Sequence, residues 1–216
     1  HRLICKSSTY QQSSRVSNKK ASQLDAENVY LWRYPTRRLG AEVVRDRTLH
    51  VSGRLNGEHF GLPIFPPLPD DIEKRVKYDN SKWATQYDAE GRKRSIYIYQ
   101  QRTLNMPLMQ TFDAPVCDES RPRRRASTTP LQALAMYNGV LVTTEVPHFA
   151  DRVISLADKT PRNRIQVAFK LAFCREASGE EVAQLEKYYQ TFQDPREAMI
   201  SICRILYNSN EFLYLD

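Results

Sequence analysis

Three residues with acid–base or metal-binding side chains recur at intervals of four in one segment: Glu42, Asp46 and His50. Side chains at this interval lie on the same face of an α-helix. Two carboxylates so placed repel each other unless a cation lies between them, so the spacing suits a metal site or a general acid–base pair. In the alternative, Arg45 or arginines of a later segment neutralise both carboxylates. We favour this alternative, because neither H-E-x-x-H nor another metal signature accompanies the three residues.

Arginines are concentrated in the stretch 58–127, which also contains Asp113. Arginine binds carboxylate, sulfate or phosphate groups in a bidentate manner, so an oxyanion pocket is one interpretation. The other, which we favour, is that one or two arginines pair with Glu42, Asp46 or Asp113 while the rest are solvated. The arginines are Arg92, Arg94, Arg102, Arg121, Arg123, Arg124 and Arg125.

Nucleic-acid binding and the familiar catalytic templates find little support. Base stacking would require Trp83, Tyr97 or Tyr99 beside the arginines, but no RNP, helix-turn-helix or zinc-finger pattern is present. The sequence also lacks the G-x-S-x-G nucleophile elbow, the P-loop and the G-x-G-x-x-G fingerprint.

Four cysteines occur, at positions 5, 117, 174 and 203, and none forms a C-x-x-C pair. A zinc site, a thioredoxin-like motif and a C-x-x-C-H haem attachment are therefore not expected. Cys174 and Cys203 lie on or beside apolar helix faces. There we expect a buried structural thiol, or a disulfide between helices, rather than a nucleophile.

The elements that must position these residues are mainly helices. Residues 128–216 predict five of them, because each start has a capping residue or a proline suited to the first helical turn. The first two break near Asn138-Gly139. The five starts are Thr129-Pro130, Thr144, Thr160-Pro161, Ser178 with Glu181, and Asp194-Pro195.

The rest of the chain is less regular. Residues 1–57 predict a polar lead-in and one helix, with Thr36 as N-cap and Gly53 as stop. The stretch 58–127 is expected to be irregular, with Arg94–Tyr99 as its strand candidate, because prolines prevent a long helix. The predicted fold class is therefore mainly α: a helical C-terminal bundle plus one N-terminal helix, with a long irregular middle stretch carrying little β structure. The prolines that prevent a long helix are Pro63, Pro66, Pro67 and Pro69. The packing face of the N-terminal helix is Ala41, Val44, Thr48, Val51 and Leu55.

The composition is that of an ordinary folded protein, with 41% hydrophobic and 26% charged residues among 216. No apolar run approaches the roughly 20 residues of a membrane helix, and residues 1–16 do not form a signal peptide. The net charge of +7 permits an anionic partner without requiring one. We expect a single domain, 1–216. Because the chain opens on His1 and not on an initiator Met, we expect this domain to be a fragment, the C-terminal part of a larger protein.

Several phrases follow one another in a characteristic order. In this order they resemble the planctomycete PSD-one domain, a C-terminal domain of unknown function in proteins that also carry planctomycete cytochrome c domains. The resemblance covers nearly the whole chain, and T-P-L-Q-A-L and N-S-N-E-F-L-Y are its most specific phrases. The phrases are His1–Ile4 with Ser8–Tyr10, Arg38–Glu42 with Arg45-Asp46 and Ser52-Gly53, Arg94–Tyr97 with Arg102-Thr103, Thr111–Pro115, Thr128–Leu134 with Asn138, and Asn208–Tyr214.

The resemblance implies an exported parent protein, periplasmic or at the cell surface, with no established activity. It implies no cofactor in this chain and haem c upstream of residue 1, where the cytochrome-type domains would be partners. Five residues after F-D-A-P, where the family often has a cysteine, this sequence has Ser120, with Cys117 nearby. The polar motif positions carried over are Glu42, Arg45, Asp46, Arg94, Arg102, Asp113, Arg123, Thr129, Gln132 and Asn138.

Two functions follow as hypotheses. The first is a binding or scaffolding module that packs against the upstream cytochrome-type part and completes its site, since many polar motif residues occur without a nucleophile or cofactor signature. The second is an enzyme domain acting on an acidic or sulfated carbohydrate. In it, arginines between residues 94 and 125 hold the anion, and Glu42, Asp46 or Asp113 serves as acid or base.

Overall fold

The computed structural model describes residues 1–78, 83–101, 104–116 and 122–215. These residues form two compact units, His1–Leu39 with Leu213–Asp216, and Gly40–Phe212. Helices predominate over strands in the described residues taken together, as the sequence predicts. The expectation of a single domain stays a prediction.

The smaller unit contains the helices α1 (Arg2–Lys6) and α2 (Lys19–Leu24) and a short antiparallel strand pair. In the pair, β1 (Arg37–Arg38) lies beside β2 (Tyr214–Leu215), and the amide of Leu39 donates to the carbonyl of Leu213 over 2.8 Å. The prediction that a helix begins after Thr36 is therefore wrong for residues 37–40. Backbone pairing with a segment about 175 residues later supplies hydrogen bonds that the local sequence does not reveal.

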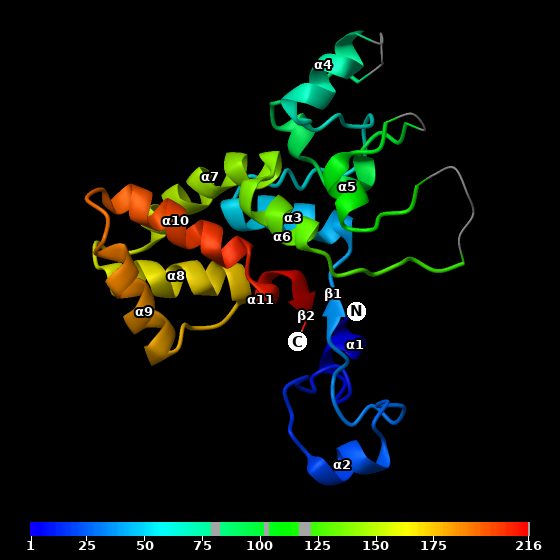
Figure 1. The fold of residues 1–216 in the computed structure, drawn as a ribbon, viewed down its shortest axis with the longest axis vertical. Coiled ribbons are helices and arrows are strands. Elements are labelled where there is room, and N and C mark those ends of the chain that lie inside the picture. Colours follow the sequence, from blue (N-terminus) through cyan, green and yellow to red (C-terminus); the bar gives the residue numbers. More distant parts are fainter. Residues whose placement is uncertain (79–82, 102–103, 117–121, 216) are drawn as a thin grey trace. The chain divides into compact units, whose positions relative to one another are not determined.

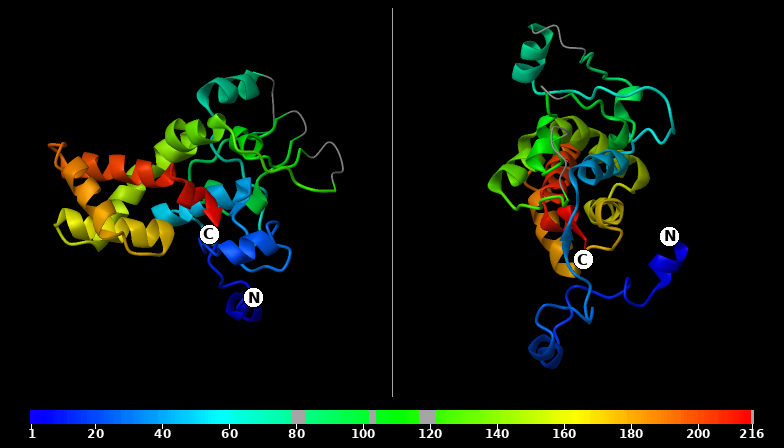
Figure 2. Two further views of the ribbon diagram at one scale, coloured as in Figure 1. Left: turned by 60° about the horizontal axis from the view of Figure 1, so that its bottom comes forward. Right: turned by 90° about the vertical axis from the view of Figure 1, so that its right-hand side faces the viewer.

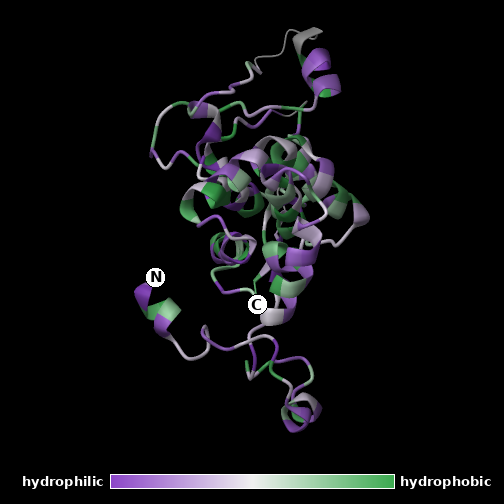
Figure 3. Ribbon diagram, turned by 90° about the vertical axis from the view of Figure 1, so that its left-hand side faces the viewer, coloured by the Kyte–Doolittle hydropathy of each residue, from purple (hydrophilic) through white to green (hydrophobic). Residues whose placement is uncertain are grey.

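The larger unit is built on α3 (Ala41–Ser52) and the C-terminal helices α6 (Pro130–Asn138), α7 (Val140–Leu156), α8 (Pro161–Phe173), α9 (Gly179–Tyr189) and α10 (Pro195–Tyr207), followed by α11 (Asn210–Leu213). Both α3 and α10 pack against α7 (Figure 1). Figure 2 (left) shows α8, α9 and α10 gathered at one end of this unit, away from α4. In Figure 3 the hydrophobic residues concentrate where the bundle helices meet.

Most of the predicted helix starts are confirmed, because they depend on local capping. Thr129 with Gln132 and Ser178 with Glu181 form capping boxes, and Thr160 and Asp194 accept hydrogen bonds from backbone amides of the first turn. The second helix is an exception, since it begins at Val140 rather than after Thr144. There Gly139 is the N-cap, and a side chain at that position would collide with the carbonyl oxygen of Ala135.

The core is a close assembly of aromatic rings around Tyr207. Its ring lies 5.1 Å from Phe149 and 5.0 Å from Phe212, and its hydroxyl donates to the carbonyl of Thr48 over 3.0 Å. Arg47 adds a second tie from α3, donating to the carbonyls of Phe212 (2.8 Å) and Ala172 (2.7 Å). The helix α3 is thus fixed against the C-terminal helices by polar bonds as well as by burial of Val44 and Leu49.

The middle stretch is largely irregular, as expected, but it contains short helical pieces. These are α4 (Asp70–Tyr78), the 3-10 turns η1 (Glu90–Arg92) and η2 (Ser95–Tyr97), and α5 (Pro107–Thr111). The prediction of a strand over Arg94–Tyr99 is wrong, because Ser95–Tyr97 form a turn and only Ile98 makes an isolated bridge, to Ile64. The β-branched and aromatic residues there serve burial instead, with Ile98 only 5% exposed. None of the helices in the described part of the chain has the length and apolar character to span a bilayer.

An ion-pair cluster ties the end of α8 to α9 and α11 and predicts how stability depends on pH. Arg175 donates to Glu181 (2.7 and 2.9 Å) and to Glu211 (2.6 and 2.7 Å). The hydrogen bonds from Arg175 lower the pKa of Glu181 from 4.5 to about 2. The stabilisation is therefore complete above pH 4.5 and is lost as the pH falls toward about 2.

We predict that Glu181→Gln flattens the fall in unfolding free energy between pH 4.5 and pH 2. The exposed neighbour Glu180 is the matched control, and Glu180→Gln should keep the wild-type slope. Chemical denaturation at a series of pH values measures both. Equal slopes for wild type and Glu181→Gln would show that the Arg175 cluster does not carry the pH dependence.

Candidate functional site

Residues of α3 line two clefts of the larger unit. The arginine cleft, of about 510 Å³, is lined by Glu42, Asp46, Arg94 and Arg124 together with the segments 95–100, 105–110 and 114–116. The proline cleft, of about 160 Å³, is lined by prolines of the 66–69 segment, by Met106, Leu108 and Leu141, and by charged residues. The first contains several residues singled out in the sequence, and the second was not anticipated.

Asp46 lies in the arginine cleft, but its carboxylate is occupied by structural hydrogen bonds. One oxygen accepts from the backbone amide and from the hydroxyl of Ser95, both at 2.7 Å. Arg45 lies 3.7 Å and Arg94 3.8 Å from the carboxylate. Asp46 therefore holds the turn Ser95–Tyr97 against α3.

Glu42 lies one helical turn before Asp46 and pairs with Arg124. The distance from Arg124 Nη1 to Glu42 Oε2 is 2.9 Å, and the arginine side chain is 58% exposed. Partial burial is the largest influence and raises the pKa of Glu42. The hydrogen bond from Arg124, a backbone hydrogen bond and the charge of Arg124 together outweigh it, so the pKa of Glu42 lies below its ordinary value. The favoured expectation, that arginines neutralise these carboxylates, agrees with this geometry. His50 is exposed on the last turn of α3.

Arg45 is buried, with 2% of its surface exposed, between α3 and the segment 91–95. It donates to the carbonyls of Gly91 (2.7 Å) and Lys93 (2.9 Å) and to the hydroxyl of Ser95 (3.2 Å). Burial lowers the pKa of Arg45 to about 10, with Asp46 and Glu145 opposing the shift. The guanidinium therefore stays charged at neutral pH. Gly91 is required there, because a Cβ atom would collide with the carbonyl oxygen of Gln86.

Three other motif residues form a separate hydrogen-bonded network. Asp113, in the left-handed conformation (φ 60°), accepts from the amide and hydroxyl of Ser127 at 2.8–2.9 Å. Gln132 donates to Ser127 (3.3 Å) and to the carbonyl of Thr111 (3.0 Å), and it forms the capping box with Thr129. Asp113 lines neither cleft, but this network fixes the segment 111–115, whose ends line the two clefts.

The remaining motif positions are scattered or undescribed. Arg123 is exposed, and Asn138 is exposed at the end of α6. Arg102 lies outside the described residues, as do Cys117, Ser120 and Arg121. Among the residues that the structure describes, no three His, Cys, Asp or Glu side chains lie together in a way that could hold a metal ion.

The cysteines beside the helices differ from one another. Cys203 is buried and Cys174 is exposed, and both are free thiols. The expectation of a buried thiol holds for Cys203, whose pKa is raised by burial. The alternative prediction, a disulfide between helices through these two residues, is therefore wrong. Cys174 follows α8 in the left-handed conformation (φ 58°), which ends the helix and turns this residue toward solvent.

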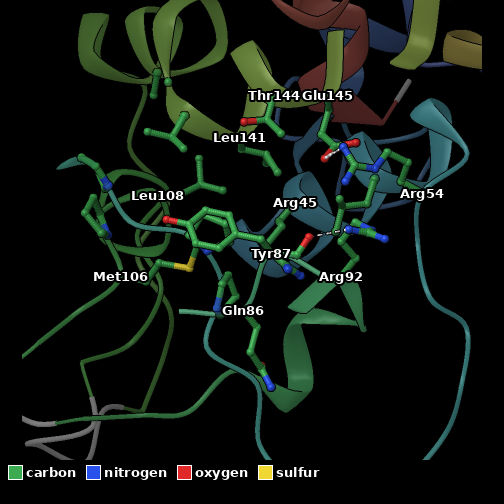
Figure 4. A pocket seen from close by; sticks show the side chains of 18 of the residues that line it. Arg45, Arg54, Gln86, Tyr87, Arg92, Met106, Leu108, Leu141, Thr144 and Glu145 are labelled. Carbon is green, nitrogen blue, oxygen red and sulfur yellow. Dashed lines mark hydrogen bonds and ion pairs between the residues drawn. The ribbon is translucent and has the colours of Figure 1, made fainter. Parts of the chain in front are cut away.

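The proline cleft divides into an apolar side and a charged side (Figure 4). Met106, Leu108 and Leu141 lie on one side, and the guanidinium groups of Arg45, Arg54 and Arg92 lie on the other with Glu145. The sequence predicted only that the prolines of the 66–69 segment prevent a long helix, and it did not predict a pocket. A pocket of apolar walls with a few convergent polar groups is the usual form of a ligand site, but its residues come from five separate segments.

Glu145 is the buried carboxylate of the proline cleft, with 3% of its surface exposed. It accepts from the hydroxyl of Ser52 (2.7 Å) and lies 3.4 Å from Arg54 Nη1. Both partners come from the end of α3 and the residues just after it. The acid therefore ties α7 to α3 and holds Arg54 in the lining of the cleft.

The roles of the two carboxylates on α3 can be separated by substitution. We predict that Asp46→Ala lowers the free energy of unfolding by roughly 2–3 kcal/mol, because it leaves the amide and hydroxyl of Ser95 unpaired and removes the nearest counter-charge of buried Arg45. Glu42→Ala, which breaks an exposed pair, should change it by less than about 1 kcal/mol. Urea denaturation of both variants measures the difference. Equal losses would contradict the structural role assigned to Asp46.

Comparison with known proteins supports the resemblance found in the sequence. The model of the PSD1 family, described as a protein of unknown function (DUF1553), matches residues 1–189. No curated protein and no solved structure matches the chain. The match includes the motif positions from Glu42 to Asn138 and ends before the phrase Asn208–Tyr214. Since it spans most of the sequence, the chain belongs to the PSD1 family, whose function is unknown.

Proposed function

We propose that this domain is a binding module of a larger exported, cytochrome-associated protein, and that its arginine cleft receives an anionic group of its partner. The observation that carries this proposal is the pair of exposed guanidinium groups, Arg94 and Arg124, on one cleft of about 510 Å³. The carboxylates beside them, Glu42 and Asp46, are already engaged by protein groups, so the charged groups of the cleft that keep free donors are these two guanidinium groups.

Arg94 has the larger unused capacity. Its side chain is 53% exposed, and its nearest carboxylate oxygen, on Asp46, is 3.8 Å away, beyond hydrogen-bonding distance. Among the described residues it donates no hydrogen bond. Arg124 donates one bond, from Nη1 to Glu42, and this leaves its other donors available. Two guanidinium forks on one open cleft suit the bidentate recognition of carboxylate or sulfate.

The same geometry argues against catalysis by the acids. Asp46 accepts two short hydrogen bonds from Ser95, and Asp113 is bound to Ser127 away from the cleft. Glu42 has a lowered pKa, whereas a general acid requires a pKa raised toward the working pH. Among the residues of this cleft that the structure describes, no pair of carboxyl groups is free as glycoside hydrolysis requires.

The partner that we propose is an acidic segment of the upstream, cytochrome-type part of the same protein, where the family resemblance also implies haem c. Exposed apolar residues on α6 support a protein partner. Leu131, Leu134 and Tyr137 recur at intervals of three and are 67%, 55% and 44% exposed. Exposed apolar side chains that share a helix face are typical of contact surfaces. The proposal also places the domain outside the cytoplasm.

We predict that Arg94→Glu and Arg124→Glu each weaken binding of the upstream part by about tenfold or more, because a repulsive charge replaces a donor. The matched control is Arg123→Glu, which makes the same charge change one residue from Arg124 and does not line the cleft. Pull-down and calorimetry at two salt concentrations measure the effect. Binding that is unaffected by all three substitutions would exclude the arginine cleft.

A sulfated oligosaccharide tests the alternative partner. If it binds in an Arg94-dependent manner while the upstream part does not, the partner is a carbohydrate and the proposed intramolecular partner is wrong. Chromatography of the incubated oligosaccharide tests the alternative of an enzyme. Cleavage products that disappear in Glu42→Gln would overturn the non-catalytic role.

A further inference from the structure

We propose that the proline cleft is a second, independent binding site, and that its ligand is a small monocarboxylic acid with an aromatic or short aliphatic body. The cleft shares Met106 with the arginine cleft but contains none of the exposed arginines proposed above. Its apolar walls, its excess of positive charge and its unpaired buried donors each limit what it can hold.

The size and the walls define the apolar part of the ligand. The cleft measures about 160 Å³, close to the volume of about 150 Å³ that accommodates one benzene ring in an apolar protein cavity. Met106, Leu108 and Leu141 provide carbon surface on one side (Figure 4), and Pro66 and Pro67 also line the cleft. A single ring or a short alkyl chain fits these dimensions.

The charges define the other end of the ligand. Arg45, Arg54 and Arg92 line the cleft against one carboxylate, Glu145. That carboxylate is engaged by Ser52 (2.7 Å) and Arg54 (3.4 Å). Asp46 lies outside the lining but 3.7 Å from Arg45. Three cations beside two carboxylates still leave an excess of positive charge at a partly apolar site, where electrostatic attraction is stronger than in water. A bound anion would balance it.

Two buried hydrogen-bond donors define where the anion would bind. The Nε atoms of Arg45 and Arg92 are buried and have no hydrogen-bond partner among the described residues. Arg45 cannot easily turn to satisfy Nε, because its terminal nitrogens are held by the carbonyls of Gly91 and Lys93. A charged donor buried without an acceptor is unfavourable. A carboxylate has two oxygens, one for each of the two donors.

Unpaired Nε atoms also occur at Arg164 and Arg204, but these residues do not line the proline cleft. What distinguishes Arg45 and Arg92 is that both line the same apolar-walled cleft. Arg164 otherwise resembles Arg92, because each donates a single hydrogen bond from one terminal nitrogen. Arg164 donates to the Tyr189 hydroxyl (2.7 Å), and Arg92 donates to the Tyr87 carbonyl (2.9 Å). Arg164 is therefore a matched control.

The test compares three probes by calorimetry on the complete chain: phenylacetate, its neutral counterpart phenylethanol, and acetate. We expect phenylacetate to bind about tenfold more tightly than phenylethanol, because only the acid has a negative charge and two acceptor oxygens, one for each arginine donor. Acetate should bind too weakly to detect, since it lacks the apolar body. Equal affinities for phenylacetate and phenylethanol, or no binding of phenylacetate at millimolar concentration, would overturn the proposal.

Substitutions locate the site. Arg92→Gln and Leu108→Glu should each weaken phenylacetate binding about tenfold, one by removing a donor and the other by placing a like charge on the wall. Arg164→Gln and Arg94→Glu should leave it unchanged. Thermal unfolding of each variant confirms that it is folded. Loss of binding in Arg164→Gln, or its retention in both cleft variants, would exclude the proline cleft as the site.

Discussion

The burial of the Arg45 guanidinium constrains the architecture of the larger unit. Removing a charged group from water costs several kcal/mol unless hydrogen bonds and a counter-charge replace the lost solvation. Here the replacement comes from the carbonyls of Gly91 and Lys93, the hydroxyl of Ser95 and the nearby carboxylate of Asp46. The segment 91–95 must therefore lie against α3, and it must be tight enough at Gly91 for the carbonyl oxygens to converge.

Both clefts depend on this arrangement, since Arg45 and Asp46 are neighbours on α3 that line different clefts. Arg45 lines the proline cleft, whereas Asp46 lines the arginine cleft. The hydrogen bonds from Ser95 to Asp46 also attach the segment 91–95 to α3, and they set the position of Arg94 beside the arginine cleft. The Asp113–Ser127–Gln132 network acts in the same way on the segment 111–115. Most of the polar motif residues that the structure describes thus fix the irregular segments of the chain against the helices.

The sequence predicted what depends on local chemistry. Starts such as Ser178 with Glu181 depend on residues three apart, so a capping pattern is sufficient to find them. The strand expected at Arg94–Tyr99 failed because the side chain of Asp46, about 50 residues away, takes the backbone amide that a sheet partner would need. The proline cleft was missed for the same reason. Its lining comes from distant segments, and each appears unremarkable by itself.

The arginines of the larger unit separate into two groups by what their nitrogens do. Arg175 uses all three nitrogens within the protein, and both terminal nitrogens of Arg47 donate to backbone carbonyls. Arg92 and Arg94 keep donors unused at the edges of clefts, and Arg45 belongs to both groups. Composition cannot make this distinction, because every arginine contributes equally to the net charge of +7. The unused donors that face a cleft, rather than the number of arginines, therefore indicate where an anion binds.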